Sequence, residues 1–173
     1  MAYAIATPSL GYSKITAIDD SALVPLGTIV RAVDPTYGEG EFIYLRGTAS
    51  ITTGLVVYYN GNTTANTAVL TTTSGVVDGG SSLAVAMAAV VADKYGWFQI
   101  GGKAVVLKTA TAINPASTFK VYLSATAGRV MPTSVAGRQV IGARFHAVAT
   151  VTTTTSTCVV TLNRPSQKTG TLV

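Results

Sequence analysis

Short runs of alternating apolar and polar side chains recur along most of this 173-residue chain. In residues 119–124, the large apolar side chains Phe119, Val121 and Leu123 occupy every second position, as they would on one face of a pleated strand. We expect these three to face the core and the intervening side chains to face the other way. The same alternation, bounded by Gly, Asn, Asp and Pro, predicts further strands at residues 28–33, 41–46, 55–59, 68–73, 95–100, 103–108, 138–150 and 157–162.

Glycine-containing pairs mark predicted tight turns between these strands. Asn60-Gly61 and Gly101-Gly102 can adopt the positive φ angles that two-residue hairpins require. We predict that the second pair joins residues 95–100 to residues 103–108 as adjacent antiparallel strands. Residues 78–82 are predicted to form a loop.

The alanine-rich run at residues 83–92 is compatible with two kinds of element. Its alanines favour a helix, which Ser81 or Ser82 could cap. Its larger side chains instead recur at odd positions, closer to the two-residue period of a strand than to the 3.6-residue period of a helix. We favour the strand and keep the helix as the alternative.

These patterns predict a single all-β domain, an antiparallel β-sandwich or partly closed β-barrel, over residues 27–164. Residues 1–26 have no sustained period and are predicted to be an extended N-terminal arm that lies on a partner surface, the alternative being a frayed terminus. Residues 165–173 are predicted to be a polar C-terminal tail. The side chains that we expect to contact a partner protein or another subunit are Tyr3, Ile5, Leu10, Tyr12, Lys14 and Ile15.

The composition favours a surface that other proteins cover. Only 11% of the residues are charged, where about a quarter is usual, while 48% are hydrophobic and no apolar stretch is long enough to span a bilayer. Twelve Lys and Arg against seven Asp and Glu give a net charge of +5. The cations are spread along the chain rather than clustered, so we predict neither nucleic acid nor membrane as a partner.

Residues that could support chemistry are sparse. The chain has one histidine, His146, which we expect at the surface beside Arg144, and one cysteine, Cys158, which we expect to be a buried structural thiol. The acidic pairs Asp19-Asp20 and Glu39-Gly40-Glu41 resemble loop acids rather than opposed catalytic carboxylates. We therefore predict no enzymatic activity, no metal site and no cofactor.

Aromatic side chains offer an alternative site. Tyr58, Tyr59, Tyr95 and Trp97 could form a platform that stacks on sugars or bases if they were exposed together. Packing in the core or between subunits uses the same residues more often, because aromatic side chains bury large areas in both places.

Three segments, residues 25–47, 54–59 and 95–104, are similar to a family of small tailed-bacteriophage virion proteins, the capsid decoration or cement proteins. The resemblance extends over roughly residues 25–128. It implies a β-rich fold, small symmetric homo-oligomers with trimers favoured, and attachment to the major capsid protein where shell subunits meet. The chain lacks the pattern of a secretory signal, so we expect synthesis in the bacterial host cytoplasm and a final location on the outer capsid surface.

Two other functions remain open at this point. One is a receptor-binding or fibre-type β domain of a phage particle, whose aromatic platform would recognise a glycan. The other is a hydrolytic enzyme of the particle, which would depend on His146 or the acidic residues.

Overall fold

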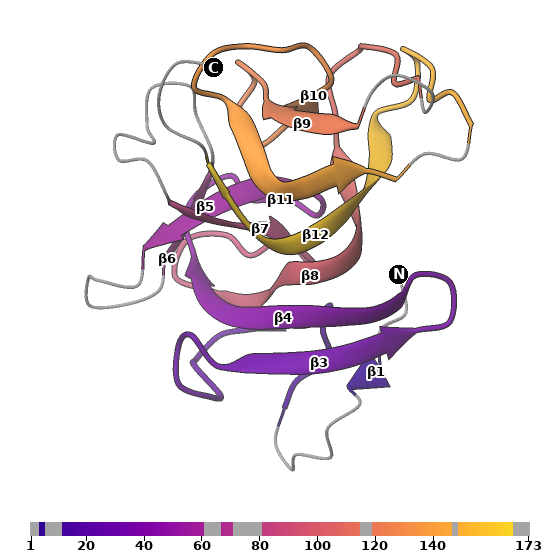
Figure 1. Cartoon of the computed structure of the whole chain (residues 1–173). Coiled ribbons are helices and arrows are strands. Elements are labelled where there is room, and N and C mark those ends of the chain that lie inside the picture. Colours follow the sequence, from indigo (N-terminus) through magenta and orange to yellow (C-terminus); the bar gives the residue numbers. More distant parts are fainter. Residues whose placement is uncertain are drawn as a thin grey trace.

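A computed structural model describes residues 4–5, 12–60, 67–70, 81–114, 119–146 and 149–167. Within these ranges the regular structure is entirely β, with no helix and therefore no helix that could cross a membrane. The strands assemble into one large bent sheet (Figure 1). The all-β antiparallel prediction is confirmed, and because the sheet does not close into a barrel the sandwich-like form is the better description.

The described part of the chain contains twelve strands. They are β1 (Ala4–Ile5), β2 (Ile18–Asp19), β3 (Ile29–Asp34), β4 (Gly38–Gly47), β5 (Val56–Asn60), β6 (Thr67–Leu70), β7 (Ser82–Ala86), β8 (Tyr95–Leu107), β9 (Lys120–Leu123), β10 (Val130–Met131), β11 (Gln139–Phe145) and β12 (Thr157–Gln167).

The long strand β8 connects the two ends of the sheet. Its residues 95–102 pair antiparallel with β4, and residues 101–107 pair antiparallel with β12. Strands β3 and β1 continue from β4 on one side, while β11, β9 and β10 continue from β12 on the other. Figure 1 shows these two groups as the lower and upper parts of the molecule.

The predicted hairpin at Gly101-Gly102 is wrong, because β8 runs through both glycines without a turn. Gly102 has a φ of +84° and pairs with Gly40 of β4, while the irregular register between Glu41 and Phe42 lies opposite residues 99–101 of β8. A Cβ atom at Gly102 would collide with the carbonyl oxygen of Glu39. Gly102 therefore permits a close approach of two strands, and the sequence alone does not distinguish such a glycine from one in a turn.

Three clusters of buried side chains form the core. The N-terminal cluster lies under residues 12–26 and contains Phe42, Tyr44 and Trp97. The central cluster packs around Phe98, and the C-terminal cluster lies among β5, β7, β8, β9, β11 and β12 with Phe145 as its largest member. The three clusters together involve both faces of β4 and β8, so these strands are apolar on both sides.

The expectation for residues 119–124 is correct for two of its three core residues. Val121 and Leu123 are each 1% exposed, but Phe119 is 51% exposed because it precedes β9 and is not part of the alternating strand. Tyr122 is buried on the opposite face, between Met131 of β10 and Gln139 of β11.

Other predicted elements differ from the structure mainly at their ends. The strand alternative for residues 83–92 is confirmed over Ser82–Ala86, after which the chain bends without forming a helix. Strand β11 ends at Phe145, and β12 continues to Gln167, three residues beyond the predicted domain boundary. Gly61 and residues 71–80 are outside the described residues.

Residues 12–26 are part of the β domain and do not leave it as an arm. Strand β2 pairs with Tyr95 and Gly96 of β8, and Ile15 is 1% exposed within the N-terminal cluster. The short strand β1 pairs with Ala32 and Val33 of β3. The structure therefore places this segment against its own domain, which differs from the boundary predicted at residue 26.

Candidate interaction surface

A polar and aromatic network holds the N-terminal segment on the domain. The carboxylate of Asp19 accepts hydrogen bonds from the hydroxyls of Ser13, at 2.9 Å, and Tyr44, at 2.6 Å. The indole N–H of Trp97 donates to the Ser13 hydroxyl at 3.2 Å, and the Tyr12 ring lies edge-on to Trp97. Burial, followed by the hydrogen bond to Asp19, raises the pKa of Tyr44 above its ordinary value.

The predicted contact residues of this segment do not form one exposed surface. Tyr12 is half-buried against Trp97, Ile15 is buried and Lys14 is exposed. Ile5 is paired through its backbone with Ala32. Tyr3 and Leu10 are outside the described residues.

The predicted aromatic platform is contradicted by burial. Trp97 is completely buried in the N-terminal cluster, which Tyr95 also contacts. Tyr58 packs against the C-terminal cluster and Tyr59 against the central cluster, because neighbouring residues of a strand point to opposite faces. The four rings therefore do not share a surface on which a sugar or base could stack.

The two residues singled out for their chemistry are where the sequence predicted them. Cys158 is buried in the C-terminal cluster, and burial raises the pKa of its thiol to about 12, so it is protonated at neutral pH. His146 is half-exposed, on the face of the sheet opposite Phe145, and its Nδ1 atom is 3.4 Å from the Thr161 hydroxyl. In the described ranges, no three His, Cys, Asp or Glu residues gather as metal ligands would.

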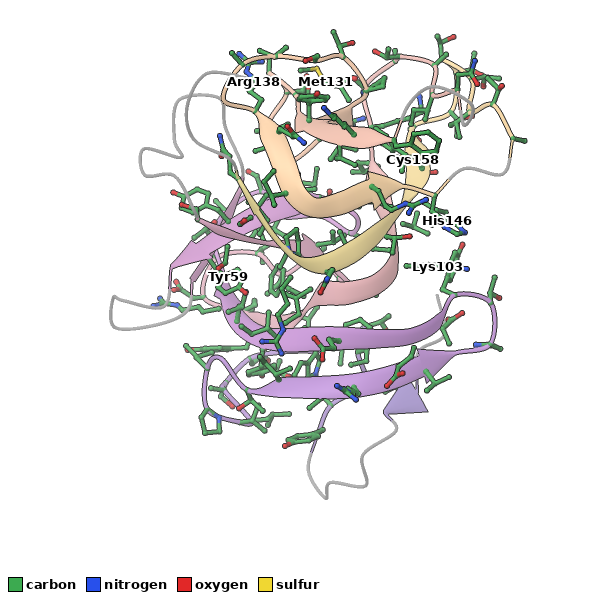
Figure 2. All side chains as sticks on the ribbon, viewed as in Figure 1. Tyr59, Lys103, Met131, Arg138, His146 and Cys158 are labelled. Atoms are coloured by element: carbon green, nitrogen blue, oxygen red, sulfur yellow. The ribbon has the colours of Figure 1, made fainter. Side chains whose placement is uncertain are left out.

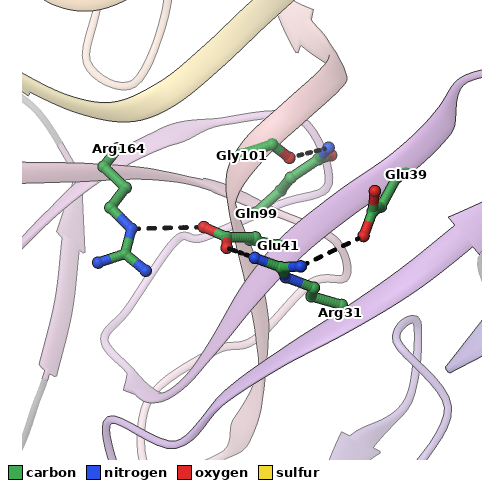
Figure 3. Close-up of polar contacts among 6 residues, drawn as sticks. All are labelled: Arg31, Glu39, Glu41, Gln99, Gly101 and Arg164. Atoms are coloured by element: carbon green, nitrogen blue, oxygen red, sulfur yellow. Dashed lines mark hydrogen bonds and ion pairs between the residues drawn. The ribbon is translucent and has the colours of Figure 1, made fainter. Parts of the chain in front are cut away.

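The carboxylates of the described residues are engaged within the molecule. Figure 3 shows Glu41 between two cations, 3.4 Å from the Arg31 guanidinium and 3.3 Å from that of Arg164, with Glu39 3.8 Å from Arg31. Two further ion pairs join Asp20 to Lys94 and Asp93 to Arg46. Asp19 accepts the two hydroxyl hydrogen bonds above, and Asp34 accepts the backbone N–H groups of residues 36 and 37.

The charges are distributed very unevenly between the two parts of the sequence. All seven acidic residues lie at or before Asp93, together with three of the twelve cations, so residues 1–93 carry a formal charge of −4. Residues 94–173 contain nine cations and no acid, a charge of +9. The spacing of the cations alone does not reveal this asymmetry, which emerges only when the positions of the acids are read with them.

Strand pairing brings part of this positive charge into one line. Lys120 of β9 is the register partner of Arg144 of β11, Arg144 is the partner of Thr161 of β12, and Thr161 is the partner of Lys103 of β8. Paired residues of adjacent strands project from the same face, so the four side chains form a row across four strands, about 14 Å long at the usual strand spacing. We call this row of Lys103, Thr161, Arg144 and Lys120 the basic row.

Apolar side chains flank the basic row. The guanidinium carbon of Arg144 lies 6.0 Å from the centre of the exposed Phe119 ring, a cation–π arrangement. Next to the row is a shallow hollow of about 420 Å³, whose lining includes Tyr37, Val105, His146 and Val159. Figure 2 shows Lys103 and His146 along the same side of the molecule.

Exposed apolar side chains also occur at the other end of the sheet. Along the outward face of β3, Ile29 and Val33 are 45% and 46% exposed on either side of Arg31. A second hollow, of about 270 Å³, lies among β3, β4, β8 and β12, and its lining includes Arg31, Glu39 and Glu41 of Figure 3. Exposed apolar side chains therefore occur both on β3 and around the basic row.

Comparisons with known proteins do not place the chain in a family. No family model, curated protein or solved structure matches it.

Proposed function

We propose that this protein is an oligomeric structural component of a bacteriophage particle that binds the outside of the capsid and stabilises the shell by bridging its subunits. The proposal rests on the resemblance of residues 25–47, 54–59 and 95–104 to capsid decoration proteins. One structural observation supports it: the domain exposes large apolar side chains on two surfaces at opposite ends of its strand order. A bridging protein needs contacts on more than one side.

The two surfaces match the composition expected of protein contacts. Protein interfaces combine an apolar centre with arginine and aromatic side chains. The β3 surface contains Ile29, Arg31 and Val33, and the surface around the basic row contains Phe119 and Arg144. With only 11% of its residues charged, the chain also loses less hydration free energy than an average domain when such surfaces are covered.

Bridging would stabilise the shell through multivalent attachment. A stable protein contact buries about 800 Å² on each partner, and linking several contacts makes each later one effectively intramolecular. Shell subunits joined in this way must lose several contacts together before they separate. The major capsid protein and further copies of this chain, a trimer being favoured, are the partners that this mechanism requires.

The test compares phage particles made with and without an intact copy of this gene. We expect electron cryomicroscopy to show an added density at junctions on the outer shell in the first preparation and its absence in the second. Particles without the protein should release their DNA at a lower temperature, which a dye-based melting assay measures. Particles with identical density and identical melting would contradict the proposal.

A further inference from the structure

We propose that the basic row is the surface that docks onto the shell, and that it binds an acidic protein surface. This inference rests on the proposed function and adds to it the face of the domain and the charge of its partner. It does not involve the N-terminal segment, whose predicted contact residues Tyr12 and Ile15 pack on the chain's own core.

The cations of this protein differ in whether the chain itself supplies them with a carboxylate. Around β3 and β4 the cations Arg31, Arg46 and Lys94 are paired with carboxylates of the same chain. Among the described residues, by contrast, none of the ion pairs includes Lys120 or Arg144. The charges of Lys120 and Arg144 are therefore available to an external partner.

The cations of the basic row lie in a line across adjacent strands. The side chains of Lys120 and Arg144 are fixed as direct cross-strand neighbours, and Lys103 continues the line two strands further on. Like charges directly opposite each other on adjacent strands are destabilising in the isolated domain. A row of carboxylates on a partner would convert this repulsion into attraction at both positions.

The side chains around the basic row favour a protein over a nucleic acid as the partner. Faces that bind nucleic acid obtain most of their affinity from many phosphate contacts. Here the cations are few, and exposed apolar groups stand beside them, Phe119 under Arg144 at 51% exposure and Ile141 on the same strand at 44%. An aromatic ring and a guanidinium at the centre of a patch are the side chains that most often dominate protein–protein binding.

The experiment measures the binding of purified protein to phage heads that were produced without it. In 50 mM salt we expect Lys120→Glu and Arg144→Glu each to weaken binding at least about tenfold. The new glutamate would then face a carboxylate of the partner and repel it. The matched control is Lys14→Glu, which makes the same charge change at an exposed position of the N-terminal segment and should change affinity by less than about twofold. Circular dichroism and thermal melting show whether each variant keeps its fold.

The outcomes separate this inference from the proposed function. If wild-type protein binds heads and the two row variants bind equally well, the basic row is not the docking face. If wild-type protein does not bind heads, the proposed function fails. The role of the basic row is then tested by the retention of the protein on immobilised poly-L-glutamate. Retention that is lost in the row variants and kept in Lys14→Glu supports it, and equal retention of all the variants overturns it.

A competition experiment tests whether the partner is a protein or a nucleic acid. A 30-base-pair DNA duplex is added as a competitor to the heads, and to the poly-L-glutamate where heads do not bind. We expect the duplex at equimolar charge to displace little of the bound protein. Complete displacement would identify a nucleic acid as the preferred partner and overturn the assignment to an acidic protein surface.

Discussion

The β3–β4 end of the sheet and the β9–β11 end are built from similar antiparallel strands but use charge differently. At the first end, acids and cations of the same chain face each other, as Arg31, Glu41 and Arg164 do. At the second end, Lys120 and Arg144 stand together with no carboxylate of the described residues paired to them. The comparison indicates that charge at the first end is satisfied internally, whereas at the second end it is available to a partner.

The two ends also hold their irregular segments in different ways. Residues 12–26 are fixed by Trp97, Tyr44 and the acceptor Asp19. At the β9–β11 end, the buried ammonium of Lys108 donates hydrogen bonds to the backbone carbonyls of Thr109, Thr111 and Thr152, at 2.9–3.1 Å. An acid, Asp19, accepts the hydrogen bonds that hold the segment at one end, and a cation, Lys108, donates them at the other. This follows the division of charge in the sequence.

The largest expected effect is that of Trp97→Ala, which removes the support of the N-terminal segment. Loss of a fully buried Trp should lower the free energy of unfolding by about 3–5 kcal/mol. Urea denaturation measures this loss, with Tyr95→Ala as a control at a half-buried position on the same strand. Equal losses in both variants would show that Trp97 is not the anchor of this end.

Lys108→Met tests the corresponding anchor at the other end. The substitution keeps most of the side-chain volume but leaves three part-buried carbonyls without their donor, so we expect a loss of about 2–3 kcal/mol in urea denaturation. Lys120→Met, on the exposed surface of β9, should change stability by less than about 0.5 kcal/mol. A loss as small as that in Lys108→Met would mean that the ammonium does not hold the two threonine-containing segments together.

The pH dependence of stability sharpens the comparison through Cys158. Burial raises the pKa of this thiol from 9.0 to about 12, so the folded protein binds its proton more tightly than the unfolded chain does. The resulting stability is complete below pH 9 and is lost as the pH rises towards 12. Between pH 8 and pH 10.5 we expect the wild-type protein to lose about 2 kcal/mol more than Cys158→Ala does.

Comparing the two proteins isolates the contribution of the thiol. Tyr44, whose pKa is also raised, should add the same loss to both of them. Parallel pH profiles of wild type and Cys158→Ala would contradict the expected role of Cys158. A thiol reagent at pH 8 gives an independent measurement, because it should react with Cys158 only after the protein unfolds.

The smallest effect is expected for Glu41→Gln, which removes the acceptor shared by Arg31 and Arg164. Both guanidinium groups are about two-thirds exposed, so the ion pairs should contribute less than about 1 kcal/mol, and less still at high salt. Urea denaturation in 20 mM and 500 mM NaCl measures both. A loss above about 2 kcal/mol would show that ion pairing is a main source of stability at this end.

Residue alternation was sufficient to locate most strands and many core positions. Val121 and Leu123 were placed correctly because a strand directs every second side chain to the same face. Phe119 was misplaced because alternation does not state where a strand begins. The charge asymmetry was also present in the sequence and needed only the positions of the acids to be read with those of the cations.

By itself, the sequence determined the all-β class, the buried thiol and the surplus of positive charge after Asp93. The tertiary structure was needed to show that β8 continues through Gly102, that Trp97 is covered by residues 12–26, and that Lys120, Arg144 and Lys103 stand in one row. The physical reason is that strand register and the covering of a surface depend on residues far apart in the chain. A local pattern specifies which side of a strand a residue occupies, but not which neighbour that side meets.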